Sequence, residues 1–148
     1  MRSIVIIGAG ELGGALARQL AAADITSRVV RGDAAGQVAE GKALDIRQAA
    51  PVDGYGTHVA GTSDESAVVG TDAIVIADRA DGSGEWQHDA GVALVRRLAY
   101  FNPAAMILCA GAGQLELVER GVRGSLPDRS LVQRVQSCCD RGVLRSAL

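Results

Sequence analysis

Residues 3–13 read SIVIIGAGELG, a β-branched apolar run followed at once by the pattern G-x-G-x-x-G. The apolar run predicts a buried strand over residues 3–7, and the small and apolar residues after the glycines predict a helix over residues 12–23. The glycine pattern is weak evidence by itself, but it gains meaning where it joins a strand to a helix. This stretch therefore predicts the start of a βαβ unit.

Each glycine of this turn has a physical reason to be there. Gly8 permits the tight turn, Gly10 lets the backbone approach a pyrophosphate, and Gly13 lets the helix pack closely on the strand. The first helical turn, which contains Glu11 and Leu12, presents free N–H groups and the positive end of the helix dipole to phosphates. The turn therefore predicts a dinucleotide ligand. The alternative is a structural turn that binds nothing.

An acidic residue about 20 positions beyond such a turn hydrogen-bonds the adenosine ribose in dinucleotide-binding folds. Asp33 lies 20 residues after Gly13, at the end of the expected second strand. We therefore predict NAD as the cofactor, held in part through Asp33. NADP stays open, because Arg28 and Arg31 lie near Asp33 and an arginine there can accept a 2′-phosphate. The alternative for Asp33 is a solvated turn residue.

Short apolar runs alternate with helical patterns along the rest of the chain, which is typical of a parallel sheet built from βαβ units. Strands are expected at residues 3–7, 28–30, 57–60, 73–77, 105–110 and 131–135, and helices at residues 12–23, 37–49, 64–69, 85–101 and 115–122. Pro51 is expected to stop the second helix. The sequence thus predicts an α/β chain with a three-layer, doubly wound Rossmann fold and a mainly parallel six-stranded sheet in the order 3-2-1-4-5-6. These elements occupy nearly all of residues 1–148, so one dinucleotide-binding domain without a substrate domain is expected.

The composition narrows the classes of protein. With 48% hydrophobic and 22% charged residues and a net charge of -2, the chain reads as an ordinary globular domain. The sequence has no basic stripe and few aromatic residues on which bases could stack, so a nucleic-acid ligand is not favoured. No apolar run is long enough for a membrane helix. Three cysteines and no signal peptide favour the reducing cytoplasm. His58 and His88 have no cysteines at ligand spacing, so no metal site is expected.

Several further segments resemble the N-terminal cofactor domain of the lactate dehydrogenase-like malate dehydrogenases. They are IVIIGAG at residues 4–10, GKALD at 41–45, AAPV at 49–52, GT at 61–62 and DAIVI at 72–76. The resemblance implies that the glycine turn holds the pyrophosphate and that Asp33 holds the adenosine ribose. It also implies that Ala77 and Asp78 lie beside the adenosine half of the cofactor.

Beyond residue 77 the chain departs from that family. Residues 77–86 read ADRADGSGEW, which is shorter than the family's loop T-A-G-A-P-R-K-P-G-M-x-R and lacks its substrate-binding arginines. The one arginine of this segment, Arg79, is expected to form an ion pair with Asp78 or Asp81. After the fifth strand the family carries an asparagine that contacts nicotinamide and substrate. Here that segment reads CAGAGQ at residues 109–114, and Asn102 is the only asparagine of the chain.

The C-terminal residues 142–148, GVLRSAL, resemble the family's G-V-L-D-S-A-R, with Arg145 at the place of the proton-relay aspartate and Leu148 at the place of the substrate arginine. Before them, Cys138 and Cys139 are read as reduced thiols. Oxidation of an alcohol by hydride transfer needs a base on the hydroxyl, and both histidines lie in other segments. We therefore assign no catalytic residue.

The leading hypothesis is an NAD(P)-binding domain of malate/lactate dehydrogenase type that lacks dehydrogenase activity on its own. One alternative is a subunit that oxidises a 2-hydroxy acid with a separately encoded catalytic domain. Another is a nucleotide-sensing regulatory module, similar to the regulatory domains of potassium channels. The helix expected at residues 85–101 carries Trp86, Tyr100 and Phe101 at its two ends, which favours a homodimer through that helix. The alternative is that its apolar face packs on the sheet.

Overall fold

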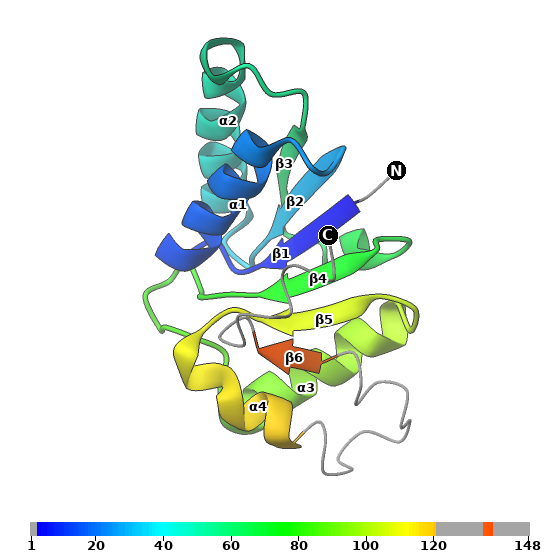
Figure 1. The fold of residues 1–148 in the computed structure, drawn as a ribbon. Helices are drawn as coiled ribbons and strands as arrows, with labels where there is room; N and C mark the ends of the chain where they lie inside the picture. The colour runs from blue at the N-terminus through cyan, green and yellow to red at the C-terminus, as the bar shows by residue number, and fades with distance from the viewer. Residues whose placement is uncertain (1–2, 121–134, 138–148) are drawn as a thin grey trace.

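The computed structural model describes residues 3–120 and 135–137 of the chain (Figure 1). In chain order its elements are β1 (Ser3–Ile7), α1 (Glu11–Ala23), β2 (Arg28–Gly32), α2 (Gly36–Asp53), β3 (His58–Thr62), the 3-10 turn η1 (Glu65–Val68), β4 (Ala73–Ile76), α3 (His88–Phe101), β5 (Met106–Cys109), η2 (Ala112–Gln114), α4 (Leu115–Arg120) and β6 (Val135–Ser137). All neighbouring strands are parallel, in the order β3-β2-β1-β4-β5-β6. The predicted Rossmann fold and strand order are confirmed.

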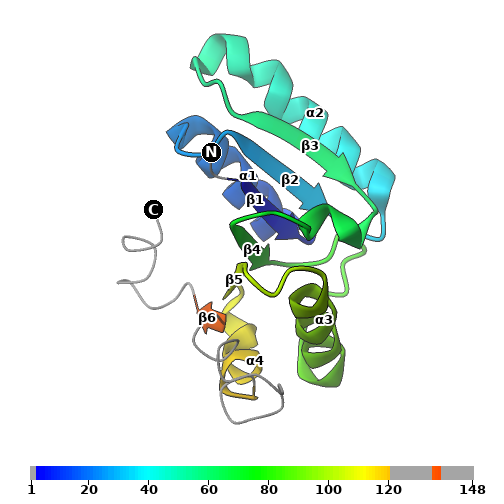
Figure 2. The same ribbon diagram turned by 90° about the vertical axis from the view of Figure 1, so that its right-hand side faces the viewer.

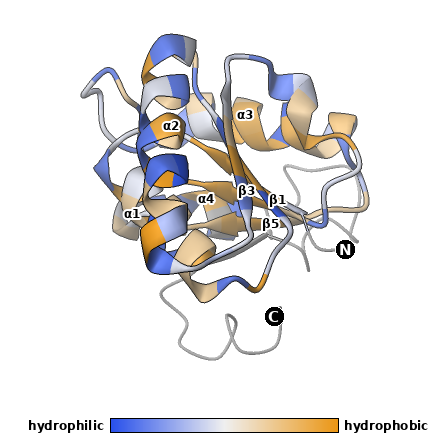
Figure 3. Cartoon of the chain, turned by 90° about the horizontal axis from the view of Figure 1, so that it is seen from above, coloured by the Kyte–Doolittle hydropathy of each residue, from blue (hydrophilic) through white to orange (hydrophobic). Residues whose placement is uncertain are grey.

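The central strands are buried on both faces, because helices cover both sides of the sheet (Figure 2). Along β1, Ile4 and Ile6 pack with α1 and α2, whereas Val5 and Ile7 pack with α3. This alternation follows from the two-residue period of a strand, and it explains why a buried parallel strand reads as a continuous apolar run. Seen from above, the apolar strands lie between helices that carry both hydrophilic and hydrophobic residues (Figure 3). The predicted three layers are confirmed.

Helix α2 differs from the prediction in its end and in its buried face. Pro51 does not stop it, because a proline in the last turn removes only one hydrogen bond. The helix ends instead at Asp53 and is capped by Gly54, which has φ +78° and whose N–H donates to Ala50 O at 2.8 Å. The residues that α2 buries are Ala39, Ala43 and Ile46, whereas Val38 and Leu44 are exposed.

Small residues bring α2 close to β3. A Cβ atom built on Gly61 would lie 2.4 Å from the backbone carbon of Ala39 and the backbone nitrogen of Glu40, so a side chain at position 61 would push α2 away. The glycine in the GT segment of β3 is therefore explained by the close approach of two backbones.

Helix α3 begins at His88, three residues later than predicted, because Glu85 belongs to a hairpin described below. Its apolar residues Val92, Leu94, Val95 and Leu98 are buried against the sheet. The alternative reading of this helix, packing on its own sheet, is confirmed, and that face is not free for a second copy. Strand β6 covers Val135–Ser137 rather than residues 131–135, of which 131–134 lie outside the described residues.

Asn102 joins the end of α3 to the loop before β4. Its buried Nδ2 donates to Val68 O at 2.7 Å and to Thr71 O at 2.8 Å. We expect Asn102→Ala to lower the free energy of unfolding by about 2–4 kcal/mol, because two buried hydrogen bonds are lost, to Thr71 O and to Val68 O, of which Val68 O keeps its bonds from Thr71. Urea denaturation measures the loss. The exposed amide at Gln37 provides the control: Gln37→Ala is expected to cost about 0.5 kcal/mol or less, and equal costs for both variants would contradict the prediction.

Candidate nucleotide-binding site

The predicted site residues gather at the carboxyl edge of the sheet. The chain leaves β1 at Gly8, β2 at Asp33, β3 at Ser63 and β4 at Ala77, and all four strands run in the same direction. The strand order reverses between β1 and β4, and α/β sheets bind ligands in the crevice outside such a switch point. The fold therefore brings together residues that are up to 70 positions apart in the sequence.

The glycine turn has the steric demands that the sequence predicted. Gly8 has φ +116°, and a Cβ atom there would lie 2.2 Å from Asp78 O. A Cβ atom on Gly13 would lie 2.3 Å from Gly8 O, inside the contact of α1 with the turn. A Cβ atom on Gly10 would also collide, at 2.2 Å, but with the carboxylate oxygen Oδ2 of Asp78. At Gly10 the close approach is thus made by the protein's own side chain.

Asp78 reaches from the end of β4 to the first turn of α1. Its Oδ1 accepts a hydrogen bond from Gly13 N at 2.9 Å, and its Oδ2 accepts one from Leu12 N at 3.1 Å. These N–H groups are the ones that a helix start offers to a bound anion. Glu11, also in this turn, has an exposed side chain with a carboxylate oxygen 3.8 Å from the Lys42 ammonium. The sequence placed Asp78 near the adenosine; the carboxylate instead lies on the predicted phosphate donors.

The neighbouring predicted residue, Ala77, is fully buried. Its N–H donates to Ile7 O at 2.8 Å, and its carbonyl accepts from Nε2 of the buried Gln114 at 3.3 Å. Ala77 therefore directly follows β4 with its backbone hydrogen-bonded, and it presents no side-chain surface to a ligand.

Asp33 is not a solvated turn residue. Its Oδ2 accepts from Ala9 N at 2.8 Å and from Ala80 N at 3.0 Å, and its Oδ1 accepts from Ala35 N at 2.9 Å. One carboxylate thus ties the glycine turn, the start of α2 and the loop after β4 together. An ionised carboxylate offers about four acceptor positions, so one remains for a ligand hydroxyl.

A buried arginine lies beneath the glycine turn. Arg31 has no exposed surface, its Nη2 lies 3.5 Å from Gly10 O, and its Nε and Nη1 have no hydrogen-bond partner among the described residues. Burial lowers the pKa of Arg31, while the attraction of Asp78, Asp33 and Glu11 acts in the opposite direction. The guanidinium is thus a positive charge held directly behind the turn.

The two arginines proposed for a 2′-phosphate do not lie where one would bind. Arg31 is enclosed under the turn, and Arg28 begins β2, at the edge of the sheet opposite to Asp33. The expectation that an arginine near Asp33 could accept this phosphate is wrong for both residues. The side chain of Arg31 is buried inside the protein, and Arg28 lies at the other end of a five-residue strand.

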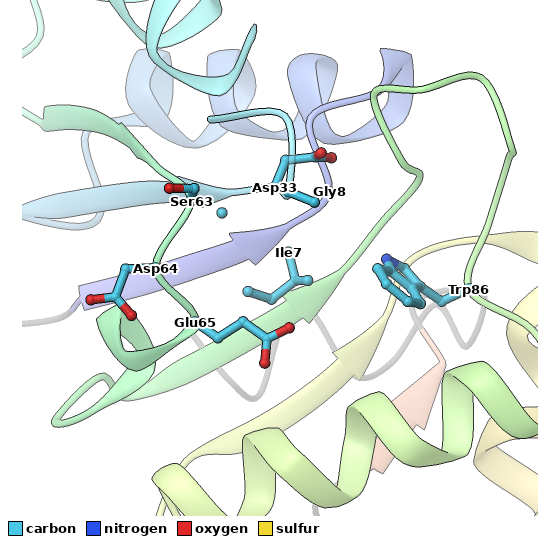
Figure 4. A pocket seen from close by; sticks show the side chains of 9 residues that line it. Ile7, Gly8, Asp33, Ser63, Asp64, Glu65 and Trp86 are labelled. Atoms are coloured by element: carbon cyan, nitrogen blue, oxygen red, sulfur yellow. The ribbon is translucent and has the colours of Figure 1, made fainter. Parts of the chain in front are cut away.

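A pocket of about 230 Å³ opens beside Asp33 (Figure 4). Its lining comes from the ends of β1, β2 and β3 and from the loop after β4, and includes Ile7, Gly32, Asp33, Ser63, Glu65 and Trp86. Of the nine lining residues, only Gly8 and Asp33 were predicted from the sequence; Ser63, Glu65 and Trp86 are among those that were not. Ser63 could have been predicted, since it directly follows the third strand and therefore lies at the carboxyl edge of the sheet. No sequence pattern predicts the position of Trp86, because that position depends on how its loop folds.

That loop folds back as a hairpin. Asp78 and Glu85 form an antiparallel bridge, and Arg79 N donates to Gly84 O at 2.9 Å. The guanidinium of Arg79 lies 4.7 Å from the centre of the Trp86 ring, in a cation–π contact. The predicted ion pair of Arg79 with Asp78 or Asp81 does not form. Asp81 is exposed and accepts hydrogen bonds from Ser83, which hold the pKa of its carboxyl below the usual value.

The hairpin also reaches the glycines after β5. Oε2 of Glu85 accepts from Gly113 N at 2.8 Å, and a Cβ atom on Gly111 would lie 2.3 Å from the Glu85 carboxyl carbon. Gln114 is buried beneath this turn and accepts from Gly111 N at 3.0 Å. The permissive backbone at residues 111–113 is thus covered by a carboxylate of the same chain.

The two histidines lie on separate exposed parts of the surface. His58 begins β3 at the opposite edge of the sheet, and His88 begins α3, with Nδ1 3.1 Å from Glu116 Oε2 on an exposed surface. Within residues 3–120 and 135–137, no group of three His, Cys, Asp or Glu side chains is arranged to hold a metal ion. None of the helices described there is both long and apolar enough to cross a membrane. Cys138, Cys139, Arg145 and Leu148 lie outside the described residues.

Comparison with known proteins identifies the fold's relatives. Residues 2–86 match the model of the lactate/malate dehydrogenase, NAD binding domain family. Malate dehydrogenase of Anaplasma marginale is 34% identical over 113 residues, which cover 71% of this chain and 36% of that protein. Malate dehydrogenase of Pelagibacter ubique is 40% identical over 76 residues, covering 51% of this chain and 24% of that protein.

Solved structures agree. Lactate dehydrogenase from Cryptosporidium parvum superposes with a TM-score of 0.60 at 27% identity, covering 75% of this chain and 35% of that one. Malate dehydrogenase from Salinibacter ruber gives a TM-score of 0.60 at 26% identity, covering 72% of this chain and 35% of that one. The matches thus span only 24–36% of these relatives' lengths. With its glycine turn, strand order and matched residues, this chain belongs to the lactate/malate dehydrogenase family, through the NAD-binding domain.

Proposed function

We propose that this chain binds NAD through the adenosine half of the cofactor, in the pocket beside Asp33. The observation that carries the proposal is the meeting of that pocket with the glycine turn, in a domain of an NAD-binding family. Pockets for drug-sized ligands enclose about 300–1,000 Å³. At about 230 Å³ this pocket suits a nucleoside rather than a whole dinucleotide.

The lining supplies the groups that an adenosine needs. The remaining acceptor position of Asp33 is available to a ribose hydroxyl, and the indole of Trp86 and the side chain of Ile7 offer apolar surface to the base. NAD would supply a hydride acceptor at its nicotinamide end.

We further propose that the chain has no dehydrogenase activity on its own. A base must take the proton of an alcohol during its oxidation. His58 begins β3 at the opposite edge of the sheet, and His88 pairs with Glu116 of α4, its Nδ1 lying 3.1 Å from Oε2 on an exposed surface. Glu85 covers that turn, and a carboxylate there offers no donor to a substrate carboxylate or carbonyl. An assay with NAD and malate or lactate, expected to give no turnover, tests this.

The homodimer and the cytoplasmic location stay predictions. The apolar face of α3 is used by the sheet, so a dimer would rest on the exposed aromatic pair at its end, Tyr100 and Phe101, whose ring centres lie 6.0 Å apart. Sedimentation of the wild-type chain and of Tyr100→Ser tests the dimer: a monomer at micromolar concentration would contradict it.

Filling the pocket tests the site. We expect Ala34→Phe to weaken NAD binding by about tenfold or more, since an aromatic ring at the rim takes the space of the base. Trp86 is the only tryptophan, so its fluorescence reports binding directly. Val52→Phe places the same ring on an exposed position near the end of α2 and serves as the control. Equal affinities for the two variants would place the ligand elsewhere.

A further inference from the structure

The pyrophosphate position of this site is occupied by the protein itself. We propose that Asp78 acts as a tethered anion that excludes phosphate from the start of α1, so that the folded chain accepts an uncharged nucleoside and admits a dinucleotide only when this side chain leaves. The inference rests on the proposed function and names the residue that sets ligand selectivity at the same site.

The contacts of Asp78 are those of a bound anion. Both carboxylate oxygens accept hydrogen bonds from backbone N–H groups of the first turn of α1: Oδ1 from Gly13 N at 2.9 Å and Oδ2 from Leu12 N at 3.1 Å. The space that Gly10 leaves open is filled by the same carboxylate, because a Cβ atom there would overlap Oδ2. A phosphate oxygen cannot share these donors with Asp78, since two anions at that distance repel each other.

Arg31 provides an independent sign that this position is built for negative charge. Its guanidinium is fully buried behind the turn, and two of its three nitrogens have no hydrogen-bond partner among the described residues. A buried cation is costly unless opposite charge lies close by. The carboxylates of Asp78 and Asp33 supply that charge when no ligand is bound, and a phosphate that replaced the Asp78 carboxylate would restore it.

The side chain of Asp78 can leave without unfolding its surroundings. The backbone at this position is held separately, by the hydrogen bond from Gly10 N to Asp78 O at 3.0 Å and by the bridge to Glu85. Rotation about the Cα–Cβ bond alone therefore frees the N–H groups of Leu12 and Gly13. The selectivity between a nucleoside and a dinucleotide then depends on one side chain, so a single substitution can test it.

The test compares three forms of the full chain, wild type, Asp78→Ala and Asp78→Asn, by calorimetric titration with NAD, adenosine and inorganic pyrophosphate. We expect Asp78→Ala to bind NAD and pyrophosphate about tenfold or more tighter than wild type, with adenosine affinity unchanged within about twofold. Asp78→Asn keeps an oxygen that can accept from Gly13 N but loses the charge, so its affinities for NAD and pyrophosphate should rise by a smaller factor. If the alanine variant does not fold, the asparagine variant provides the test. Asp81→Ala removes a charge from the same loop and should behave as wild type.

Each possible result supports or overturns the inference about Asp78. If NAD and pyrophosphate bind the Asp78 variants no tighter than wild type, the inference is overturned, whether or not the wild type binds NAD. If the variants gain pyrophosphate binding while no form binds NAD or adenosine, the exclusion of phosphate by Asp78 stands, whereas the proposed function and the acceptance of a nucleoside both fail. If no form binds any of the three ligands, both are overturned.

Discussion

Gly8→Ala is expected to lower the free energy of unfolding by about 3–5 kcal/mol, among the largest effects that one methyl group can have. Two costs combine. Gly8 has φ +116°, a conformation that side chains rarely adopt. The added Cβ would also lie 2.2 Å from Asp78 O, an atom of the neighbouring strand's end that cannot move without breaking its hydrogen bond from Gly10 N. Urea denaturation followed by circular dichroism measures the loss.

Gly54→Ala separates the two costs. Gly54 also has a positive φ, +78°, but a Cβ atom there meets nothing within 4 Å. Only the backbone strain remains, so this control should lose about 1 kcal/mol. If Gly8→Ala costs no more than Gly54→Ala, the contact between the glycine turn and β4 is not as close as described.

Asp33→Ala is expected to lower the free energy of unfolding by about 2–4 kcal/mol, because three backbone N–H groups lose a charged acceptor. The same change should weaken NAD binding by about tenfold or more through the lost ribose contact. Stability comes from urea denaturation, and binding from Trp86 fluorescence at a temperature at which the variant is folded.

Two controls separate the structural and binding roles of Asp33. Asp33→Asn keeps two acceptor positions on one oxygen and should recover part of the stability. Asp53→Ala, at the exposed end of α2, should change neither quantity appreciably. If Asp33→Ala weakened NAD binding without any loss of stability, Asp33 would be a ligand residue only, contrary to its three hydrogen bonds.

Local chemistry was enough to predict the elements and their order. The strand at Ser3–Ile7 was predicted to the residue, because its apolar run and the glycine after it are both local signals. Two boundaries were wrong for different reasons, one local and one tertiary. Pro51 stays within α2 because the helix is near its end there, and Glu85 stays outside α3 because it pairs with Asp78.

The candidate site was predicted in part. Gly8 and Gly13 were placed correctly because their need for glycine follows from a turn that the motif itself encodes. The position of Asp33 was also predicted, but its three backbone partners come from three different segments. Arg79 was misread, since its stacking on Trp86 depends on how the hairpin folds.

The sequence by itself determined the alternation of strands and helices, the glycine turn and the family of this protein, because period, turn chemistry and motif are properties of neighbouring residues. Only the tertiary structure decided what fills the site. Asp78 meets Leu12 and Gly13 across 66 and 65 positions of sequence. That contact exists because β4 lies beside β1, so that the end of one strand faces the helix that follows the other. No local pattern records such a meeting, and it is this meeting that places a carboxylate where the motif predicts a phosphate.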